Sequence, residues 1–380
     1  MTIKAMSQKK KIGIYIHIPF CRSKCLYCDF CSAPSRDGEK ISLYVERLIE
    51  DIRSYRGDTD YLPADTVYFG GGTPTLMTGE QFSGILCAVR ERFGICDGAE
   101  ISSECNPRTV DAEKLSSMRA AGINRLSIGM QSGIDSELKA LGRAHKFSDV
   151  EETVRMARES GFDNISLDIM YGIPNQTADT LKETLDKAIS LSSEHLSLYA
   201  LKIEDGTPFC KMQDKLSLPD EDTVADMYLY ICDRLQKNEY NKYEISNFAK
   251  IGFESRHNLK YWNYDDYIGF GPSAHSFVGN CRIENSCDTD AYIRGEDIVE
   301  SSTVISESER MNEYVMLSMR LARGVDIADF EKRFGADFDG FAEKFKKFSP
   351  EFVTLDLGRC AFTEKGFLVS NYILSECLEF

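Results

Sequence analysis

The sequence lacks any apolar run of about 18 residues, the length that an α-helix needs to span a bilayer. It is also poor in positive charge, because 45 lysines and arginines stand against 61 aspartates and glutamates, for a formal net charge of −16. A net charge of this sign repels nucleic acid and anionic membrane surfaces. The first residues are basic but lack the apolar segment and cleavage site of a secretory signal. We therefore expect a cytoplasmic protein with no transmembrane segment and no nucleic-acid partner.

The cysteines do not form the even, regularly spaced set that is typical of a disulfide framework. There are 13 of them, and four fall between Cys21 and Cys31. That clustering favours metal binding over disulfide bonds. We expect the other cysteines to be reduced, small and mostly buried thiols. They are Cys87, Cys96, Cys105, Cys210, Cys232, Cys281, Cys287, Cys360 and Cys377.

Six short runs rich in β-branched and aromatic residues predict buried strands. Segments of helical character separate them, and several of these end at a glycine. Strands that alternate with helices predict a parallel sheet, and six such units are fewer than the eight of a closed barrel. The predicted fold is therefore α/β, a partial (β/α)6 barrel over residues 1–206. The runs begin at Ile12, Thr66, Glu100, Arg125, Asn164 and His195.

The pattern changes after residue 206. Residues 207–300 contain a long predicted helix, DEDTVADMYLYICDRLQ, and then a stretch rich in glycine and aromatic residues. In residues 301–380 three helical runs precede two alternating segments, FVTLDLG and CAFTEKG. Helices followed by a hairpin predict a small winged-helix-like α+β domain at the C-terminus. Because this segment is net acidic, we expect it to support the fold or dock a partner rather than bind DNA.

Three cysteines fall on one predicted loop after the first strand, as Cys21-x3-Cys25-x2-Cys28. Thiolate sulfur is the usual ligand of iron-sulfur clusters. Three ligands leave one iron of a four-iron cluster open, and an open iron can bind a small molecule. Zinc is the alternative, but zinc sites usually bring a second pair of ligands at similar spacing, and none is evident. We predict one [4Fe-4S] cluster on these cysteines.

This motif, with Tyr27 just before its last cysteine, resembles the signature of the radical S-adenosylmethionine (SAM) superfamily. In that superfamily SAM binds the open iron and is split to give a 5′-deoxyadenosyl radical. A second motif, Gly70-Gly71-Gly72-Thr73-Pro74, follows the next predicted strand and resembles the site for the amino group of SAM. Its glycines would let a ligand approach the backbone closely. Alone, the motif is equally typical of a turn.

Further polar residues match the SAM contacts of the superfamily, and the resemblance implies their roles. Arg143 has the planar fork that suits the methionine carboxylate. Asp168 and Gln131 suit ribose hydroxyls. Taken singly, each is also typical of an ordinary residue at a strand end. The remaining implied contacts are Tyr15, Glu104 and the backbone around Ala200.

Nearly the whole chain resembles one branch of the superfamily. The segments YIHIPFC, GGGTPTL, DIMYGIP, YEISNFA, RHNLKYW and GFGPSAHS are similar to the HemW family, heme chaperones related to oxygen-independent coproporphyrinogen III oxidases. The run from His257 to Trp262 is similar to the H-N-x-x-Y-W heme-binding motif of that family. The resemblance implies that heme is bound by His257, Asn258, Tyr261 and Trp262.

A histidine beside aromatic rings can ligate heme iron while the rings stack on the macrocycle. Without the resemblance, a hydrogen-bonded core histidine is the simpler interpretation of His257. His17 and His275 are further candidates for contact with heme or the cluster. We expect His145 and His195 to be structural.

Three alternative functions stay open. A true coproporphyrinogen III oxidase resembles this chain, but it has a cysteine where Phe30 stands, and it has a longer extension than the fourteen residues before Tyr15. Cys31, one position later, is expected to be a free thiol, or else an alternate cluster ligand. A radical SAM heme-degrading methyltransferase would fit the cluster equally well. The third alternative is a heme chaperone with a vestigial SAM site.

The resemblance also implies partners. Heme would pass to apo-hemoproteins, which the resemblance to the family implies are respiratory ones. Cluster loading would promote a homodimer, and docking at a membrane-bound recipient would be transient. The sequence leaves open whether SAM is cleaved.

Overall fold

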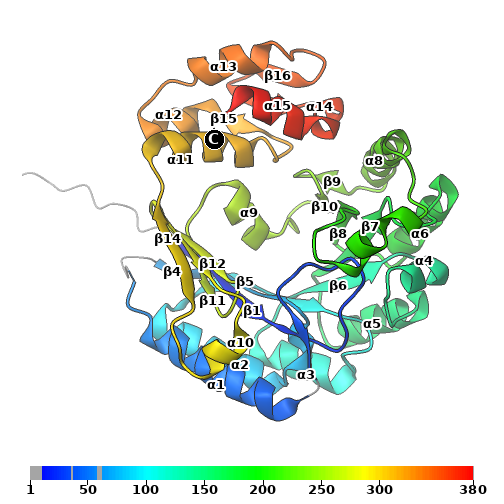
Figure 1. Ribbon diagram of the computed structural model, residues 1–380, viewed down its shortest axis with the longest axis vertical. Coiled ribbons are helices and arrows are strands. Elements are labelled where there is room, and N and C mark those ends of the chain that lie inside the picture. Colours follow the sequence, from blue (N-terminus) through cyan, green and yellow to red (C-terminus); the bar gives the residue numbers. More distant parts are fainter. Residues whose placement is uncertain (1–10, 36, 58–61, 380) are drawn as a thin grey trace, which may run out of the picture.

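The computed structural model describes residues 11–35, 37–57 and 62–379. Figure 1 shows a curved sheet with helices along its outer side and a small domain of helices and strands beyond one end of the curve. No helix in these ranges combines the length and the apolar character that crossing a membrane requires.

Six parallel strands form the middle of a twelve-stranded sheet and neighbour one another in chain order. Each of the six predicted runs overlaps one of these strands and extends no more than two residues past either of its ends, so the predicted partial barrel is confirmed. The strands are β1 (Lys11–Ile18), β4 (Leu62–Gly71), β5 (Ile95–Cys105), β6 (Arg125–Gln131), β7 (Ile165–Tyr171) and β8 (His195–Ala200).

Helices connect these strands and cover the outer face of the sheet (Figure 1). Local signals fix their ends. Asp37 accepts hydrogen bonds from two backbone N–H groups at the start of α1, and Thr78 forms a capping box with Gln81 at the start of α2. The helices are α1 (Gly38–Ser54), α2 (Gly79–Arg92), α3 (Ala112–Ala121), α4 (Asp135–Ala140), α5 (Phe147–Glu159) and α6 (Ala178–Ser190).

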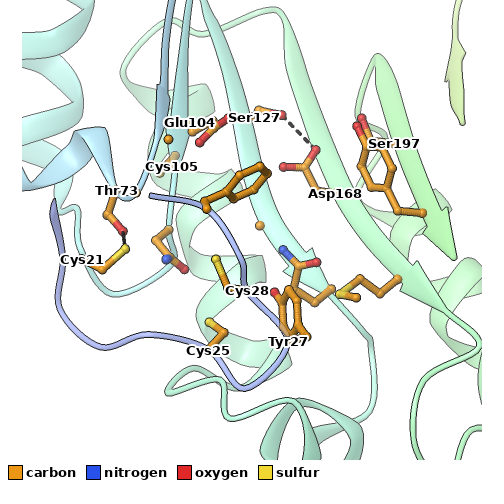
Figure 2. A pocket seen from close by; sticks show the side chains of 18 of the residues that line it. Cys21, Cys25, Tyr27, Cys28, Thr73, Glu104, Cys105, Ser127, Asp168 and Ser197 are labelled. Carbon is orange, nitrogen blue, oxygen red and sulfur yellow. Dashed lines mark hydrogen bonds between the residues drawn. The ribbon is translucent and has the colours of Figure 1, made fainter. Parts of the chain in front are cut away.

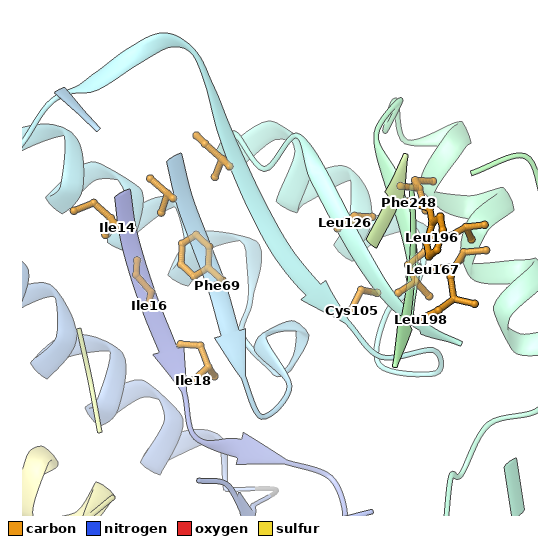
Figure 3. Close-up of a cluster of buried hydrophobic side chains, with 14 of the residues drawn as sticks. Ile14, Ile16, Ile18, Phe69, Cys105, Leu126, Leu167, Leu196, Leu198 and Phe248 are labelled. Atoms are coloured by element: carbon orange, nitrogen blue, oxygen red, sulfur yellow. The ribbon is translucent and has the colours of Figure 1, made fainter. Parts of the chain in front are cut away.

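The core lies between the sheet and these helices, because alternate strand residues point outward. Ile14, Ile16 and Ile18 of β1 and Phe69 of β4 are fully buried there (Figure 3). Burying each such side chain contributes about 1.5–3 kcal/mol to the free energy of unfolding. The residues between them point inward, toward the hollow of the partial barrel.

Strand register aligns the inward-pointing residues near the carboxyl ends of the strands. Tyr15 of β1 lies opposite Tyr68 of β4. Asp168 of β7 lies between Gly129 of β6 and Ser197 of β8. Polar groups from separate strands therefore meet at one end of the barrel, where parallel α/β sheets place their sites.

Residues 207–304 extend both edges of the same sheet. At the β8 edge, β10 (Asn247–Ala249) and β9 (Asn241–Lys242) add antiparallel strands. At the β1 edge, β11 (Tyr267–Phe270) pairs in parallel with β1, and β12 (His275–Val278), β13 (Cys281–Asn285) and β14 (Val299–Val304) follow it. The division of the chain at residues 206 and 300 stays a prediction. The helices of this segment are α7 (Pro208–Lys211), α8 (Glu221–Gln236), α9 (Arg256–Trp262) and α10 (Thr289–Ile293).

The C-terminal part begins with three helices and ends with a hairpin and two further helices. The helices and the hairpin confirm the prediction, whereas β15 and the last two helices were not predicted. Phe330, Phe338 and Phe345 are buried here and belong to the same continuous hydrophobic cluster as the barrel core. The elements are α11 (Glu307–Ser318), β15 (Val325–Asp326), α12 (Ile327–Phe334), α13 (Asp339–Lys346), β16 (Val353–Asp356), β17 (Arg359–Phe362), α14 (Glu364–Leu368) and α15 (Ser370–Cys377).

Candidate functional site

The three motif cysteines lie on the loop that follows β1 and line one cavity of about 400 Å³ (Figure 2). The loop starts at β2 (Phe20–Cys21), which pairs with β3 (Ala33–Pro34). Thr73 donates its hydroxyl hydrogen to the sulfur of Cys21 at 3.6 Å, and Arg143 donates to the sulfur of Cys25 at 3.4 Å. Both donors stabilise negative charge on sulfur.

The donor set fits an iron-sulfur cluster. Such a cluster takes one cysteine sulfur per iron, so its ligands surround it instead of converging on one atom. The three thiols line one cavity, and two of them already receive hydrogen bonds. Burial raises the pKa of the Cys28 thiol to about 11, so iron would have to displace its proton on binding. Across the described ranges, no three His, Cys, Asp or Glu side chains converge as a single metal ion requires.

The glycine motif forms the wall beside Cys21. Gly72 donates its N–H to the carbonyl of Ile18 at 2.8 Å, and Thr73 donates to the carbonyl of Phe20 at 2.7 Å. A Cβ at Gly72 would stand 2.5 Å from that Phe20 oxygen. Glycine is therefore needed for the motif to pack against the cysteine loop, a role separate from any contact with a ligand.

Two carboxyl groups face the cavity and are hard to ionise there. Burial, with the nearby charge of Asp168 as a second cause, raises the pKa of Glu104 to about 8. Burial likewise raises the pKa of Asp168 to about 6. Tyr68 donates to Glu104 at 3.2 Å. Ser127 donates to Asp168 at 2.9 Å (Figure 2). A cationic ligand would favour the charged form of both.

Arg143 is held by the strand ends around it. Its guanidinium donates to the carbonyl of Gly129 at 3.1 Å and to the side-chain oxygen of Asn106, in addition to the Cys25 sulfur. Gln131 has φ of 64° at a register shift between β6 and β7. Such a bulge redirects a side chain, and here it brings Gln131 to the cavity.

Most of the predicted cluster and SAM residues line this one cavity. Those brought together are Cys21, Cys25, Tyr27, Cys28, Gly71, Gly72, Thr73, Glu104, Gln131, Arg143, Asp168 and Ala200. Asn258, which the resemblance assigned to heme, lines this cavity and not the second one. Further lining residues were not predicted, although the inward phase of each strand would have indicated several of them. These are Tyr68, Asn106, Arg125, Ser127, Ser197 and Tyr199.

His257 lies outside this cavity, in the interior. The residue is only 1 % exposed. Its imidazole ring stacks on the ring of Tyr68, with the two ring centroids 5.2 Å apart. Both ring nitrogens are hydrogen-bonded, Nδ1 with Thr66 at 2.8 Å and Nε2 with the hydroxyl of Tyr261 at 2.8 Å. Burial lowers the pKa of His257 to about 3, which keeps the ring neutral. Its predicted bond to heme iron stays a prediction.

A second cavity, of about 380 Å³, adjoins the first. Helix α9, whose place in the fold can be seen in Figure 1, supplies Tyr261 to its wall. Asp29 and Phe30 line both cavities. Tyr15 and Tyr261, two of the predicted contacts, lie here and not in the first cavity, and Trp262 lines neither. The second cavity is lined by Tyr15, His17, Asp29, Phe30, Cys31, Tyr261, Tyr267, Ser273 and His275.

Cys31 is not the free thiol or cluster ligand that we expected, and Cys287 is not reduced. The two form a disulfide that links the cysteine loop to the turn between β13 and α10. Their separation of 256 residues hides the pairing from the sequence, because only the fold brings them together. His145 and His195 are buried and hydrogen-bonded, as expected of structural residues.

Family models match two parts of the chain. Residues 15–188 match the radical SAM superfamily, and residues 305–369 match the HemN C-terminal domain. The first match runs from β1 into α6 and so covers five of the six parallel strands, because β8 begins only at His195. The second match spans most of the C-terminal part.

Curated relatives cover almost all of the chain. The heme chaperone HemW of Lactococcus lactis is 34% identical over 376 residues, which is 97% of this chain and 98% of the relative. The heme chaperone HemW of Bacillus subtilis is 37% identical over 334 residues, 86% of this chain and 88% of the relative. Among solved structures, the coproporphyrinogen III oxidase HemN of Escherichia coli, a radical SAM enzyme, has a TM-score of 0.83 at 24% identity. It covers 98% of this chain and 91% of its own, and it shares the fold.

Proposed function

Since the chain belongs to the HemW family of the radical SAM superfamily, we propose that it is a heme chaperone, which binds heme and delivers it to apo-hemoproteins. We further propose that it does not oxidise coproporphyrinogen III. The observation that carries the proposal of a heme chaperone is the pair of adjoining cavities that share Asp29 and Phe30. One is lined by thiols and polar groups, and the other by aromatic rings.

We assign the first cavity to a [4Fe-4S] cluster and SAM, the cofactors of the superfamily. Cys21, Cys25 and Cys28 would hold the cluster, which together with SAM supplies one-electron chemistry when bound. Arg143 is already oriented by the Gly129 carbonyl, and it presents a fixed cation to a carboxylate. The same cavity has room for the contacts expected of Tyr27, Gly71, Gly72 and Thr73.

The carboxyl groups of the first cavity suit the cationic and hydroxyl groups of SAM. Glu104 carries a proton near neutral pH because of its burial, and it would lose that proton when an ammonium group binds beside it. Asp168 and Gln131 are acceptors and donors for ribose hydroxyls, and the backbone of Ala200 lies at the end of β8 for the adenine.

Heme, as the cargo, is assigned to the aromatic second cavity. Tyr261 lies in its wall, and His257 hydrogen-bonds to the hydroxyl of Tyr261. The H-N-x-x-Y-W segment thus reaches the cavity through its tyrosine. Phe30 occupies the position where the oxidases carry a cysteine, and its side chain is 62% exposed at the boundary of both cavities.

The partners proposed from the family are apo-hemoproteins, of the respiratory type, reached in the cytoplasm and by transient docking at a membrane. A homodimer on cluster loading is part of the same proposal. The net charge of −16 favours recipients with a basic docking surface.

The test is anaerobic reconstitution of the cluster, followed by incubation with SAM, dithionite and either heme or coproporphyrinogen III. Absorption spectroscopy follows heme, product chromatography follows porphyrinogens, and apomyoglobin serves as an acceptor. Stoichiometric heme binding, transfer faster than from heme-loaded serum albumin, and no protoporphyrinogen are expected. Conversion of coproporphyrinogen would overturn the proposal in favour of the oxidase.

A further inference from the structure

The histidines of the chain differ in how available their ring nitrogens are. All five lie in the described part of the chain, and four are buried. The fifth, His275, has a side chain that is 50% exposed and lines the second cavity. No hydrogen bond to its Nε2 occurs among the described residues, so this nitrogen is free to bind a metal.

His17 is the other histidine of the second cavity, and its ring is already engaged. Its Nδ1 lies 3.1 Å from the hydroxyl of Tyr15, and its Nε2 lies 2.9 Å from the carbonyl oxygen of Cys31. A metal bond to either nitrogen would require breaking an interior hydrogen bond. The same holds for His257, whose two ring nitrogens bond Thr66 and Tyr261.

A carboxylate stands behind His275. Its Nδ1 lies 3.7 Å from Glu284, and the two residues face each other across β12 and β13. Histidines that ligate metals usually donate their second ring N–H to a carboxylate, which orients the ring and increases its basicity. At 3.7 Å the pair is not yet hydrogen-bonded, but a small rotation of either half-exposed side chain would close the distance and leave Nε2 as the ligand atom.

The hairpin that carries His275 is closely packed. A Cβ at Gly269 of β11 would come within 2.2 Å of the backbone carbonyl oxygen of His275. The backbone of β12 is therefore held at a fixed distance from β11, whose Tyr267 lines the same cavity. Tyr267 packs edge-on against Tyr261 with ring centroids 4.6 Å apart.

From these contacts we infer that His275 is the protein ligand to the iron of heme held in the second cavity. This inference rests on the proposed function. The neutral Nε2 lone pair forms the bond to iron, Glu284 orients the ring, and Tyr261 and Tyr267 contact the porphyrin. His257 acts as a positioning residue, because it fixes the hydroxyl of Tyr261. A cavity of about 380 Å³ lies at the lower end of ligand-site sizes, so heme would stay partly exposed and able to leave.

The experiment titrates hemin into the full-length reconstituted protein and four variants: His275→Ala, His275→Met, Glu284→Gln and His257→Phe. Absorption and electron paramagnetic resonance spectra report the iron ligand, and circular dichroism checks the fold. Because His275 is half exposed, free imidazole can reach the vacant position in His275→Ala.

We expect His275→Ala to lose the histidine-ligand spectrum and to bind hemin at least about tenfold more weakly, the scale of losing a partner to a metal ligand. Added imidazole should restore the spectrum, and His275→Met should give a methionine-ligand spectrum in a folded protein. Glu284→Gln should weaken binding by roughly tenfold with the ligand unchanged. His257→Phe should weaken binding but keep the histidine-ligand spectrum.

The results that would contradict us distinguish a failure of the proposed function from a failure of the inference about His275. If wild-type protein binds no heme, the proposed function fails. If wild type binds heme and both His275 variants keep its spectrum, the inference fails while the proposed function stands. Loss of the histidine spectrum in His257→Phe alone would transfer the ligand role to His257.

Discussion

The two adjoining cavities differ in how the fold builds them. The first collects residues from the five parallel strands β4 to β8 and from the cysteine loop that follows β1. Its lining is rich in thiol, carboxyl and guanidinium groups. The second lies at the β1 edge, where β11 and β12 extend the sheet, and four of its nine lining residues are tyrosine or phenylalanine. A repeating α/β unit thus supplies polar chemistry, whereas an irregular extension supplies an aromatic surface.

The largest expected effect is loss of the cluster from the first cavity with no change in heme binding to the second. Cys28→Ala should abolish the cluster, measured as iron and acid-labile sulfide after anaerobic reconstitution, because a three-thiolate site loses one ligand. Hemin affinity should stay unchanged, since Cys28 does not line the second cavity. The control is Cys105→Ala, which removes a thiol from the same cavity without removing a proposed ligand. A full iron content in Cys28→Ala would contradict the assignment.

The next largest expected effect is on stability, and it comes from the disulfide of Cys31, which lines the second cavity. Cys287→Ser should lower the free energy of unfolding by about 2–4 kcal/mol without reductant, because the disulfide closes a long loop of the unfolded chain. With reductant, the variant and wild type should unfold at the same denaturant concentration. Urea denaturation measures this, and non-reducing mass spectrometry should detect the linked peptides.

Cys281→Ser provides the matched control for that measurement, because Cys281 is a free thiol of the neighbouring strand β13. An equal loss in Cys281→Ser would show that the disulfide is not the cause.

A pH effect should be confined to the first cavity. With the pKa of Glu104 raised to about 8, the folded protein binds its proton more tightly than the unfolded chain does. Folding stability from this group is therefore full at acidic pH and is lost as pH rises through about 8. In the proposed site the ammonium group of SAM meets the carboxylate form of Glu104, so SAM affinity should rise by up to about tenfold per pH unit from about pH 6 to pH 8.

Glu104→Gln should remove the part of this pH dependence that Glu104 causes, as measured by isothermal titration of SAM into reconstituted protein. Glu113→Gln, at an exposed position in α3, should leave it intact. Equal pH profiles for wild type and Glu104→Gln would show that the carboxyl group does not meet a cation.

The smallest effect tests the aromatic wall. Tyr267→Ala should weaken hemin binding by roughly two- to tenfold, because one aromatic pair contributes about 0.5–1.5 kcal/mol beyond its buried area. SAM affinity should not change, because Tyr267 does not line the first cavity. Tyr372→Ala, at an exposed position of α15, is the control. A parallel loss of SAM affinity would show that the cavities do not act separately.

For the first cavity, periodicity predicted the strands and where they end, and the resemblance to the radical SAM superfamily supplied the residues expected at those ends. Glu104, Asp168 and Gln131 come from three different strands, and the parallel order alone brings their ends together. The bulge that redirects Gln131 could not be predicted, because it depends on the register between β6 and β7.

The second cavity was predicted only in part. Residues 241–304 form short strands at both edges of the sheet, and short strands carry little periodic signal. The position of His257 beneath Tyr68, and the bond between Cys31 and Cys287, depend on packing between distant segments. Sequence similarity could name the H-N-x-x-Y-W segment but could not indicate which of its side chains reach the surface.

The chain has a single tryptophan, and it lies at the end of α9, directly after Tyr261 of the second cavity. Heme absorbs where indole emits, so its arrival beside α9 should quench the fluorescence of Trp262. The protein therefore carries its own optical reporter at the site assigned to its cargo. Loading and release of heme can be timed from this emission in the unlabelled protein, with no signal from any other tryptophan to subtract.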